Sequence, residues 1–349
     1  MPHFHLRRRD ILCGAALCLA APAIARAQAP VVRLRLHHFL SPVSNAHTRF
    51  LVPWARDIEK DSSGRIRIDL FPTMQLGGTA AQLYDHAIDG TADLVWTLPG
   101  LTPGRFPRIE VFELPFIADR RAVPNSRAVQ ELYETQLRDE FKAVHPICVF
   151  AHDQGVLHTA KPVQTMSDLK DMRVRAPTRL SAQALNALGA NGITMPVAQV
   201  HDALARRVID GCLLPWEVVP AVRVQDRVKH HAELAGSPTL YTATFLLAMN
   251  ASRYAALPPD LKNVIDRHSG QAAAQRAARM WDDLAVTVED NVRRQGNSVA
   301  QIEGAEAERW RKATEPVIAA WLAEAAKVHK FDGAALIAQA RTLIAKYAG

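Results

Sequence analysis

The stretch from Asp168 to Glu217 constrains the fold more strongly than any other part of the 349-residue chain. In Met172-Arg173-Val174-Arg175-Ala176, apolar and charged residues alternate with the period of a β-strand. Pro177 ends this strand, because it has no N–H group for a sheet ladder. Apolar residues at helical spacing then predict helices over residues 180–188 and 200–208, before a second strand. The alternation of strands and helices predicts a mostly parallel α/β sheet, in which ligands usually bind beyond the carboxyl ends of the strands.

The N-terminal part of the chain repeats this alternation. Strand-like runs over residues 32–39 and 66–71 flank a run over residues 50–58 whose apolar positions line one face of a helix. The length of the chain allows two α/β lobes of this kind.

The C-terminal part of the chain is predicted to be helical. A helical pattern runs from Pro259 toward Gly296 and would exceed ~50 Å at the usual rise per residue, unless Gly270 breaks it. Residues 310–327 and 334–347 continue as a helical tail, in which Pro316 is expected to bend the first helix.

The first 27 residues have the pattern of an export signal. Arg7-Arg8-Arg9 precede an apolar run from Ile11 to Ala23, which is shorter than the ~20 residues of a membrane span. Ala25-Arg26-Ala27 fits a cleavage site after Ala27, and this site is favoured over one after Ala29. The two arginines before an apolar run fit either a twin-arginine signal or an ordinary Sec signal, so the export route stays open. Either route predicts a location in the periplasm.

The charge of the chain does not point to nucleic acid. The precursor carries a formal charge of +7, and loss of the signal removes four arginines and one aspartate, which leaves +4. No basic stripe with interleaved aromatic residues is present, so we predict no nucleic-acid partner. Two cysteines, Cys148 and Cys212, stay in the mature chain and could pair in an oxidising compartment. Their positions in apolar strands favour two separate buried thiols.

The sequence offers little that would support catalysis or metal binding. It contains no GxSxG, HExxH or CxxC motif. The pairs His37-His38 and His230-His231 have no cysteine or carboxylate at ligand spacing, so we predict no metal and no cofactor. Asp210 and Glu217 could form a carboxylate pair for acid–base work, but Asp210 is better explained as the cap of the turn at Gly211.

Several motifs, in their order and spacing, resemble the solute receptors of tripartite ATP-independent periplasmic (TRAP) transporters, the DctP-like family. The matching runs are Phe71-Pro72, Gln75-Leu76-Gly77-Gly78, Gly90-Thr91-Ala92-Asp93, Glu113-Leu114-Pro115-Phe116, Asp168–Pro177, Leu188-Gly189-Ala190, Met195-Pro196 and Asp210-Gly211. The chain departs from the usual family pattern at Asp171, where the family has Gly, and at Arg173, where it has Lys. The resemblance implies an α/β, two-lobe periplasmic-binding-protein-like fold (type II-like), with a long helix spanning both lobes and a helical C-terminal tail.

This fold divides the chain at the strands that cross between the lobes. The expected segments are a signal peptide (1–27), lobe I (28–150), lobe II (151–238), a return to lobe I (239–258), and a lobe-spanning helix with C-terminal helices (259–349).

The resemblance also implies a function and a site. It implies a monomeric periplasmic receptor that binds a small organic acid in the cleft between the lobes and delivers it to the membrane subunits of a TRAP transporter, without catalysis. Arg175 matches the family's carboxylate-binding arginine, and Gln154 stands near the place where some members have a second arginine. Two alternatives stay open: a ligand sensor that signals without transport, and a periplasmic enzyme on the same fold with Asp210 or Glu217 as base.

Residues at the ends of strands supply the other candidate ligand contacts. His38 and Phe39 end the first strand, and Trp96 ends a strand that begins near Ala92, so all three are expected at the cleft.

The run Leu213-Leu214-Pro215-Trp216 predicts an apolar wall for the same cleft. Family members often carry Asn where this chain has Leu214. We therefore expect Leu214 and Trp216 to favour a monocarboxylate with an apolar or aromatic body over a compact dicarboxylate. Glu217, which follows Trp216, could accept a hydrogen bond from a ligand hydroxyl or bind a cation.

Overall fold

A computed structural model describes residues 31–349 of the chain. The predicted signal peptide, residues 1–27, lies outside the described residues. No helix within residues 31–349 is long and apolar enough to cross a membrane.

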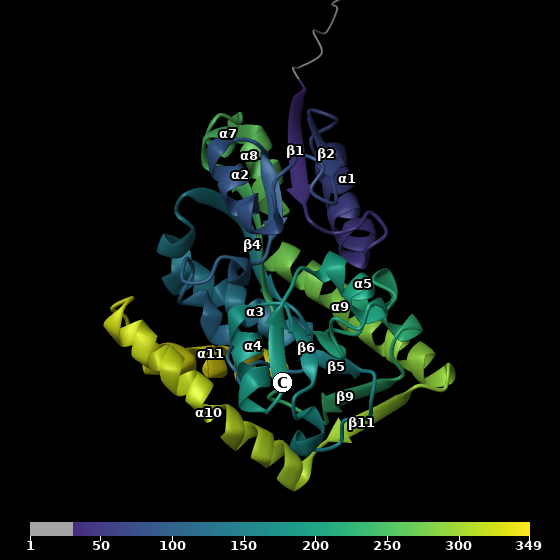
Figure 1. Ribbon diagram of the computed structural model, residues 1–349. Coiled ribbons are helices and arrows are strands. Elements are labelled where there is room, and N and C mark those ends of the chain that lie inside the picture. Colours follow the sequence, from purple (N-terminus) through teal and green to yellow (C-terminus); the bar gives the residue numbers. More distant parts are fainter. Residues whose placement is uncertain (1–30) are drawn as a thin grey trace, which may run out of the picture. The chain divides into compact units, whose positions relative to one another are not determined.

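Two mixed β-sheets form the framework of the described part of the chain (Figure 1). The first sheet has the strand order β2-β1-β3-β10-β4 and the second has the order β11-β9-β5-β8-β6-β7. The strands of the first sheet are β1 (Val32–His38), β2 (Ile66–Phe71), β3 (Leu94–Thr97), β4 (Val144–Ala151) and β10 (Thr244–Asn250). The strands of the second sheet are β5 (Val156–Thr159), β6 (Arg173–Ala176), β7 (Asn191–Thr194), β8 (Gly211–Leu214), β9 (His230–Leu234) and β11 (Ser298–Ile302).

Helices cover these sheets and connect them. They are α1 (Val52–Asp61), α2 (Leu83–Asp89), α3 (Ala122–Leu132), α4 (Arg179–Ala187), α5 (Val200–Ala205), α6 (Val218–Ala221), α7 (Ala251–Ala255), α8 (Pro259–Arg267), α9 (Gly270–Arg294), α10 (Gly304–Lys327) and α11 (Gly333–Ala348). A short π-helical turn, η1 (Ala46–Leu51), leads into α1.

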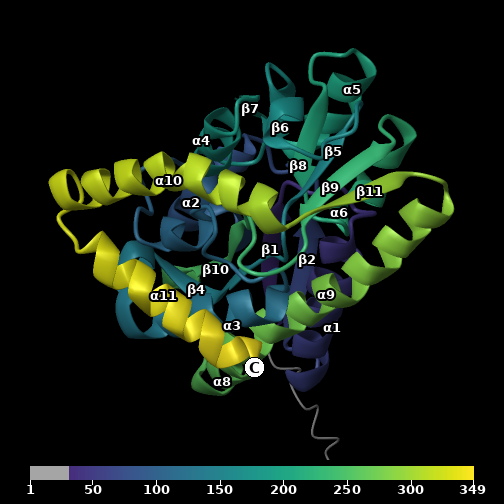
Figure 2. The ribbon, with the colours of Figure 1, turned by 90° about the horizontal axis from the view of Figure 1, so that it is seen from below.

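Helix α9 packs on both sheets. Its first half buries Ala274 and Trp281 in the core of the first sheet, and its second half buries Val288 and Val292 against strands and helices of the second sheet. Beyond it, α10 packs against α4 and α11 returns along α3 (Figure 2). The predicted two-lobe fold, with a lobe-spanning helix and a helical tail, is therefore confirmed.

The sheets are less parallel than the sequence predicted. The strands within each βαβ unit, such as β1, β2 and β3, pair in parallel as expected. The strands next to the crossings between the sheets, β4, β5, β9 and β10, form antiparallel pairs instead. The reason is topological, because a strand that returns directly from the other sheet enters from the opposite end.

The secondary structure differs from the sequence prediction in three places. The sequence also predicts a helix over residues 218–229, but the structure has only the short α6 there, and β9 begins at His230. The strand β11, which pairs in parallel with β9, was not predicted. The long helical pattern is divided at Gly270, which has a φ of +62°, into α8 and the 25-residue α9. At about 1.5 Å per residue, α9 alone is roughly 37 Å long.

Candidate ligand-binding site

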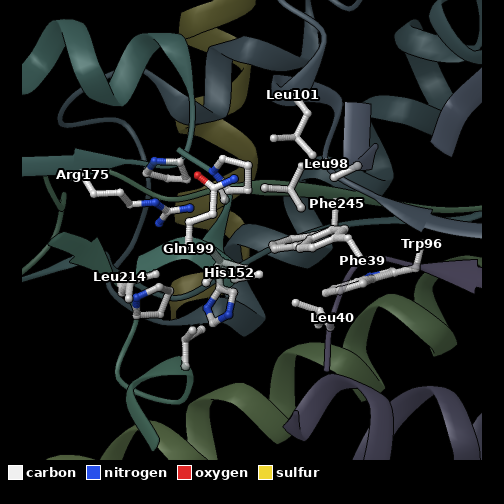
Figure 3. A pocket seen from close by; sticks show the side chains of 18 of the residues that line it. Phe39, Leu40, Trp96, Leu98, Leu101, His152, Arg175, Gln199, Leu214 and Phe245 are labelled. Carbon is white, nitrogen blue, oxygen red and sulfur yellow. The ribbon is translucent and has the colours of Figure 1, made fainter. Parts of the chain in front are cut away.

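A largely apolar cavity of about 370 Å³ lies between the two sheets. Side chains that follow β1 and β3 of the first sheet form one wall, and side chains from the ends of β6 and β8 of the second sheet form the other (Figure 3). Five of the eight predicted site residues line it, and these are Phe39, Trp96, Arg175, Leu214 and Glu217. The volume falls in the range of small-molecule sites, so the cavity can enclose a compact ligand.

Arg175 supplies a positive charge to this cavity. The residue is only 3% exposed, and Figure 3 shows its guanidinium directed into the cavity beside Gln199. Its Nε donates to the Met195 carbonyl oxygen (2.9 Å) and its Nη1 donates to the Leu213 carbonyl oxygen (3.2 Å). Within residues 31–349 no carboxylate pairs with it, and burial lowers the pKa of Arg175 to about 10. The guanidinium is therefore a buried cation whose counter-charge is not supplied by the described chain.

Aromatic rings form the opposite end of the cavity. The Trp96 ring stacks between Phe39, at 5.4 Å between ring centroids, and Phe245, at 4.9 Å (Figure 3). Interplanar angles of 10° and 6° make this a nearly parallel stack. Trp281 of α9 continues the aromatic wall beside Phe245.

A second charged group in the cavity, His152, is fully compensated by the protein. Its Nδ1 contacts the Asp153 carboxylate, and its Nε2 lies 3.1 Å from Oε1 of Glu217. Burial alone would lower the pKa of His152, but these two carboxylates outweigh burial and raise it to about 9. The side chain of Asn45 donates to Oε2 of Glu217 (3.1 Å) and also to its backbone oxygen (3.1 Å). These contacts join the loop before η1 to the turn after β8.

Trp216 does not lie where the sequence prediction placed it. The indole is 1% exposed, and it is not among the residues that line the cavity. Its Nε1 donates to the Glu233 carboxylate (2.9 Å), and its ring meets His158 edge-on. Strand β8 ends at Leu214 and the chain turns after Pro215, so the two-residue repeat of the strand does not extend to Trp216, whose indole packs in the core of the second sheet.

Gln154 and His38 also lie outside the cavity lining. Gln154 donates to Glu233 (3.0 Å), in the core behind the cavity. His38 uses both ring nitrogens within the protein, since Nε2 lies 2.9 Å from Nδ1 of His47 and Nδ1 accepts from the backbone of Leu40. Burial and the neighbouring His47 lower the pKa of His38 to about 3. The ligand contacts expected from these two side chains are therefore not available in this structure.

The cavity includes side chains that sequence reasoning missed. His152 lines the cavity but was not predicted to do so. Gln154, two residues later, was predicted instead, because some family members have a second arginine near that place. Tyr241 and Phe245 lie in the apolar segment that returns to the first sheet. Side chains alternate between the two faces of a strand, and this pattern could have distinguished the residues that face the cavity from those that face the core. No sequence signal marked Trp281, which reaches the cavity from the middle of α9.

The remaining candidates are structural in the described part of the chain. Asp210 forms a two-pronged ion pair with Arg173, with distances of 2.8 and 2.9 Å, outside the cavity. Residues 31–349 contain no group of three or more side chains suited to hold a metal ion. Cys148 and Cys212 are both buried free thiols, in different sheets, as the sequence favoured.

Comparison with known proteins identifies the family. Residues 36–325 match the model of bacterial extracellular solute-binding protein family 7, DctP. A TRAP solute-binding protein from Rhodoferax ferrireducens, solved with copurified benzoate, is 41% identical, with a TM-score of 0.87, and the match covers 91% of this chain and 99% of that one.

Two further structures extend the likeness to other receptors of aromatic acids. A marine metagenome TRAP protein specific for aromatic acid ligands, solved with 3-hydroxybenzoate, is 36% identical with a TM-score of 0.89, covering 92% of this chain and all of that one. A Bordetella bronchiseptica TRAP protein with bound mandelate is 29% identical with a TM-score of 0.83, covering 90% and 99%. The chain therefore belongs to the DctP family of extracellular solute-binding proteins, the solute receptors of TRAP transporters.

Proposed function

We propose that the protein is a periplasmic receptor that encloses an aromatic monocarboxylate between its lobes and delivers it to the membrane subunits of a TRAP transporter. The observation that carries this proposal is Arg175, a buried cation without a carboxylate partner in residues 31–349, at one end of an apolar cavity. A guanidinium binds a carboxylate through parallel donors, and the bound anion would replace the missing counter-charge.

Tyr241 offers a second donor for the same carboxylate. Its ring lines the cavity, and its hydroxyl is buried without a hydrogen-bond partner in the described chain. A buried hydroxyl without a partner is costly, so a ligand that accepts from it is favoured. We infer that Arg175 and Tyr241 together take the place of the two-arginine clamp found in some family members.

The body of the ligand is inferred to be aromatic. The stack of Phe39, Trp96 and Phe245 presents flat apolar surface, against which a ring can pack with offset or edge-on geometry. The relatives solved with benzoate and 3-hydroxybenzoate support this choice.

A second carboxylate on the ligand is disfavoured. Two other charged side chains line the cavity, His152 and Glu217, and Asp153 pairs with His152 behind the wall, so one cation lies between two carboxylates. A dicarboxylate with one carboxylate at Arg175 would bring its second carboxylate into a cavity that already holds this surplus of negative charge. The expected ligand therefore carries one carboxylate.

Calorimetric titration of the mature protein with four matched compounds tests this function. We expect benzoate to bind more tightly than cyclohexanecarboxylate and succinate, and its neutral amide, benzamide, to bind poorly. Native mass spectrometry of freshly purified protein would identify any acid that copurifies. Equal binding of benzoate and benzamide would contradict a carboxylate site at Arg175.

The export, partner and non-enzyme parts of the proposal have their own tests. The periplasmic protein is expected to begin at Gln28, which terminal sequencing can check. Lobe boundaries near residues 150 and 238 predict hinge motion at the crossings, which scattering with and without ligand can detect. A bound acid should be recovered unchanged after long incubation, whereas an enzyme would alter its mass. Loss of acid uptake in a deletion strain would distinguish a transport receptor from a sensor.

A further inference from the structure

Of the His152–Asp153–Glu217 cluster, Glu217 is the side chain that both lines the cavity and can still accept a hydrogen bond, since Asp153 does not line the cavity. A carboxylate can accept about four hydrogen bonds, and Glu217 accepts one at Oε1 from His152 and one at Oε2 from Asn45. Both nitrogens of His152 are occupied, by Asp153 and by Glu217, so the imidazole has no further N–H to offer. His152 and Asn45 therefore hold the Glu217 carboxylate in place, and its remaining lone pairs are available at the cavity wall.

Glu217 and Arg175 line the same cavity but do not pair with each other. Glu217 is not an ion-pair partner of Arg175, since its contacts are His152 and Asn45. It lines both the main cavity and a smaller adjoining cavity of about 230 Å³. A ligand whose carboxylate meets Arg175 can thus bring a substituent on its ring to Glu217, with additional space beyond.

We propose that Glu217 accepts a hydrogen bond from a hydroxyl group on the ring of the bound acid, so that the preferred ligand is a hydroxylated aromatic monocarboxylate. This inference rests on the function proposed above. An acceptor that is 6% exposed, in a largely apolar cavity, favours a ligand that carries a donor. A neutral hydroxyl meets this need at a lower desolvation cost than an ammonium group.

The first test uses the unmodified protein and a ligand series. Affinities are measured by calorimetry for benzoate, 3- and 4-hydroxybenzoate, and the two corresponding methoxybenzoates. At least one hydroxybenzoate is expected to bind roughly ten- to a hundredfold more tightly than benzoate, the range for a hydrogen bond to a charged group. Its methoxy counterpart should lose this gain. The adjoining cavity leaves room for the methyl group, so such a loss would reflect the missing donor rather than a steric clash.

The second test changes the acceptor. The ratio of hydroxybenzoate affinity to benzoate affinity is expected to fall in Glu217→Gln, which keeps a neutral acceptor, and to approach one in Glu217→Met, which has none. Glu233→Gln is the matched control, because Glu233 is also a buried carboxylate but accepts from Trp216 and Gln154 outside the cavity. The control should leave the ratio unchanged, and thermal melting reports whether each variant is folded.

The outcomes separate this inference from the function on which it rests. If benzoate binds and neither hydroxybenzoate binds more tightly, Glu217 does not accept a hydrogen bond from a ligand hydroxyl. The inference is then wrong, while the receptor function stands. A methoxybenzoate that binds as tightly as its hydroxybenzoate, or 3-(aminomethyl)benzoate binding more tightly than both hydroxybenzoates, would also overturn it. If no aromatic acid binds, the proposed function itself fails.

Discussion

Two buried cations line the same cavity, and their surroundings differ in one decisive respect. His152 lies between the carboxylates of Asp153 and Glu217, whereas Arg175 has only carbonyl oxygens as partners in the described chain. Burial acts on both, yet the pKa of His152 is raised to about 9 while the pKa of Arg175 is lowered to about 10. The protein neutralises the first charge itself and leaves the second for a ligand.

This contrast gives a physical criterion for locating the ligand's charge. A buried charge without a counter-ion is expensive, so it persists in a fold only where function requires it. On the proposed function, the paired cation stabilises the folded protein, and the unpaired cation stabilises the complex with the ligand. Substitutions of His152 should therefore change folding stability, and substitutions of Arg175 should change ligand affinity.

The largest expected effect is the loss of binding in Arg175→Ala. Removal of the guanidinium would leave the ligand carboxylate buried and unpaired, which costs on the order of 3–5 kcal/mol of binding free energy. Arg175→Lys should also bind weakly, because an ammonium cannot reproduce the forked donors. Since the free protein loses an uncompensated buried charge, its melting temperature should stay the same or rise. Calorimetric titration and thermal melting on the same samples measure both quantities.

Arg173→Ala is the matched control for that experiment. Arg173 lies two residues earlier on β6, but it is half-exposed and paired with Asp210. Exposed ion pairs contribute roughly 0–1 kcal/mol to stability, so this variant should keep its affinity. If Arg175→Ala binds every acid as well as the parent does, the carboxylate is held elsewhere and the comparison between the two cations fails.

A second test compares two tryptophans that the sequence treated alike. Trp96 belongs to the aromatic stack in the cavity, so Trp96→Ala should weaken binding of an aromatic acid by about 2–3 kcal/mol, the scale of a truncated aromatic anchor. Trp216 is buried behind the cavity, so Trp216→Ala should instead cost about 3–5 kcal/mol of folding stability. The preference of the Trp216 variant for benzoate over succinate should not change. A selective loss of benzoate binding in that variant would mean that Trp216 contacts the ligand.

The third prediction concerns pH and the satisfied cation. The folded-state pKa of His152, about 9, is above the ordinary value of 6.5, so the folded protein holds a proton that the unfolded chain releases. The stabilisation is complete below pH 6.5 and is lost as pH rises toward 9. Between pH 6.5 and 8 the expected loss is on the order of 1–2 kcal/mol of folding stability. Denaturant unfolding at both pH values, for the parent protein and His152→Gln, isolates this contribution as a difference.

Affinity should respond to pH in another range. The proposed counter-charge of the ligand is Arg175, whose pKa is about 10, so binding should hold between pH 7 and 9 and weaken only above about 10. An affinity that falls together with stability between pH 6.5 and 8 would mean that the two cations act as one unit.

The sequence alone predicted the features of the fold that depend on local periodicity. Alternation of apolar and charged residues placed β6 and therefore Arg175 at the end of a strand, next to the cleft. The repeated strand–helix units, together with the family resemblance, gave the two lobes. Short polar strands such as β9 and β11 were missed, because they depend on pairing with each other across 68 residues rather than on their own composition.

The side-chain choices within the site were harder to predict. Gln154 and Trp216 lie two residues after His152 and Leu214, which do line the cavity, but both lie beyond the ends of β4 and β8, where the alternation of side chains along a strand no longer applies. The compensation of His152 by Glu217 brings together residues 65 positions apart, and only the folded chain reveals it. The charge of Arg175 was visible in the sequence, but its lack of a counter-ion was not.

The smallest expected effect on affinity comes from Asn45, and it tests whether this residue of the first lobe holds Glu217 in place. The Asn45 side chain lies before η1 and donates to both the side chain and the backbone of Glu217, after β8 of the second sheet. Asn45→Ala would remove one neutral hydrogen bond, worth about 0.5–1.5 kcal/mol, together with one to the Glu217 carboxylate, and would leave the Glu217–His152 contact in place. Because the lost bonds join the lobes rather than the ligand, benzoate and hydroxybenzoate should weaken by the same factor, about fivefold. Asn45→Asp places a carboxylate against Glu217 and should weaken both ligands further. Titration of both ligands against both variants decides the matter, and an effect confined to hydroxybenzoate would mean that Asn45 acts by orienting Glu217 toward the ligand hydroxyl rather than by joining the lobes.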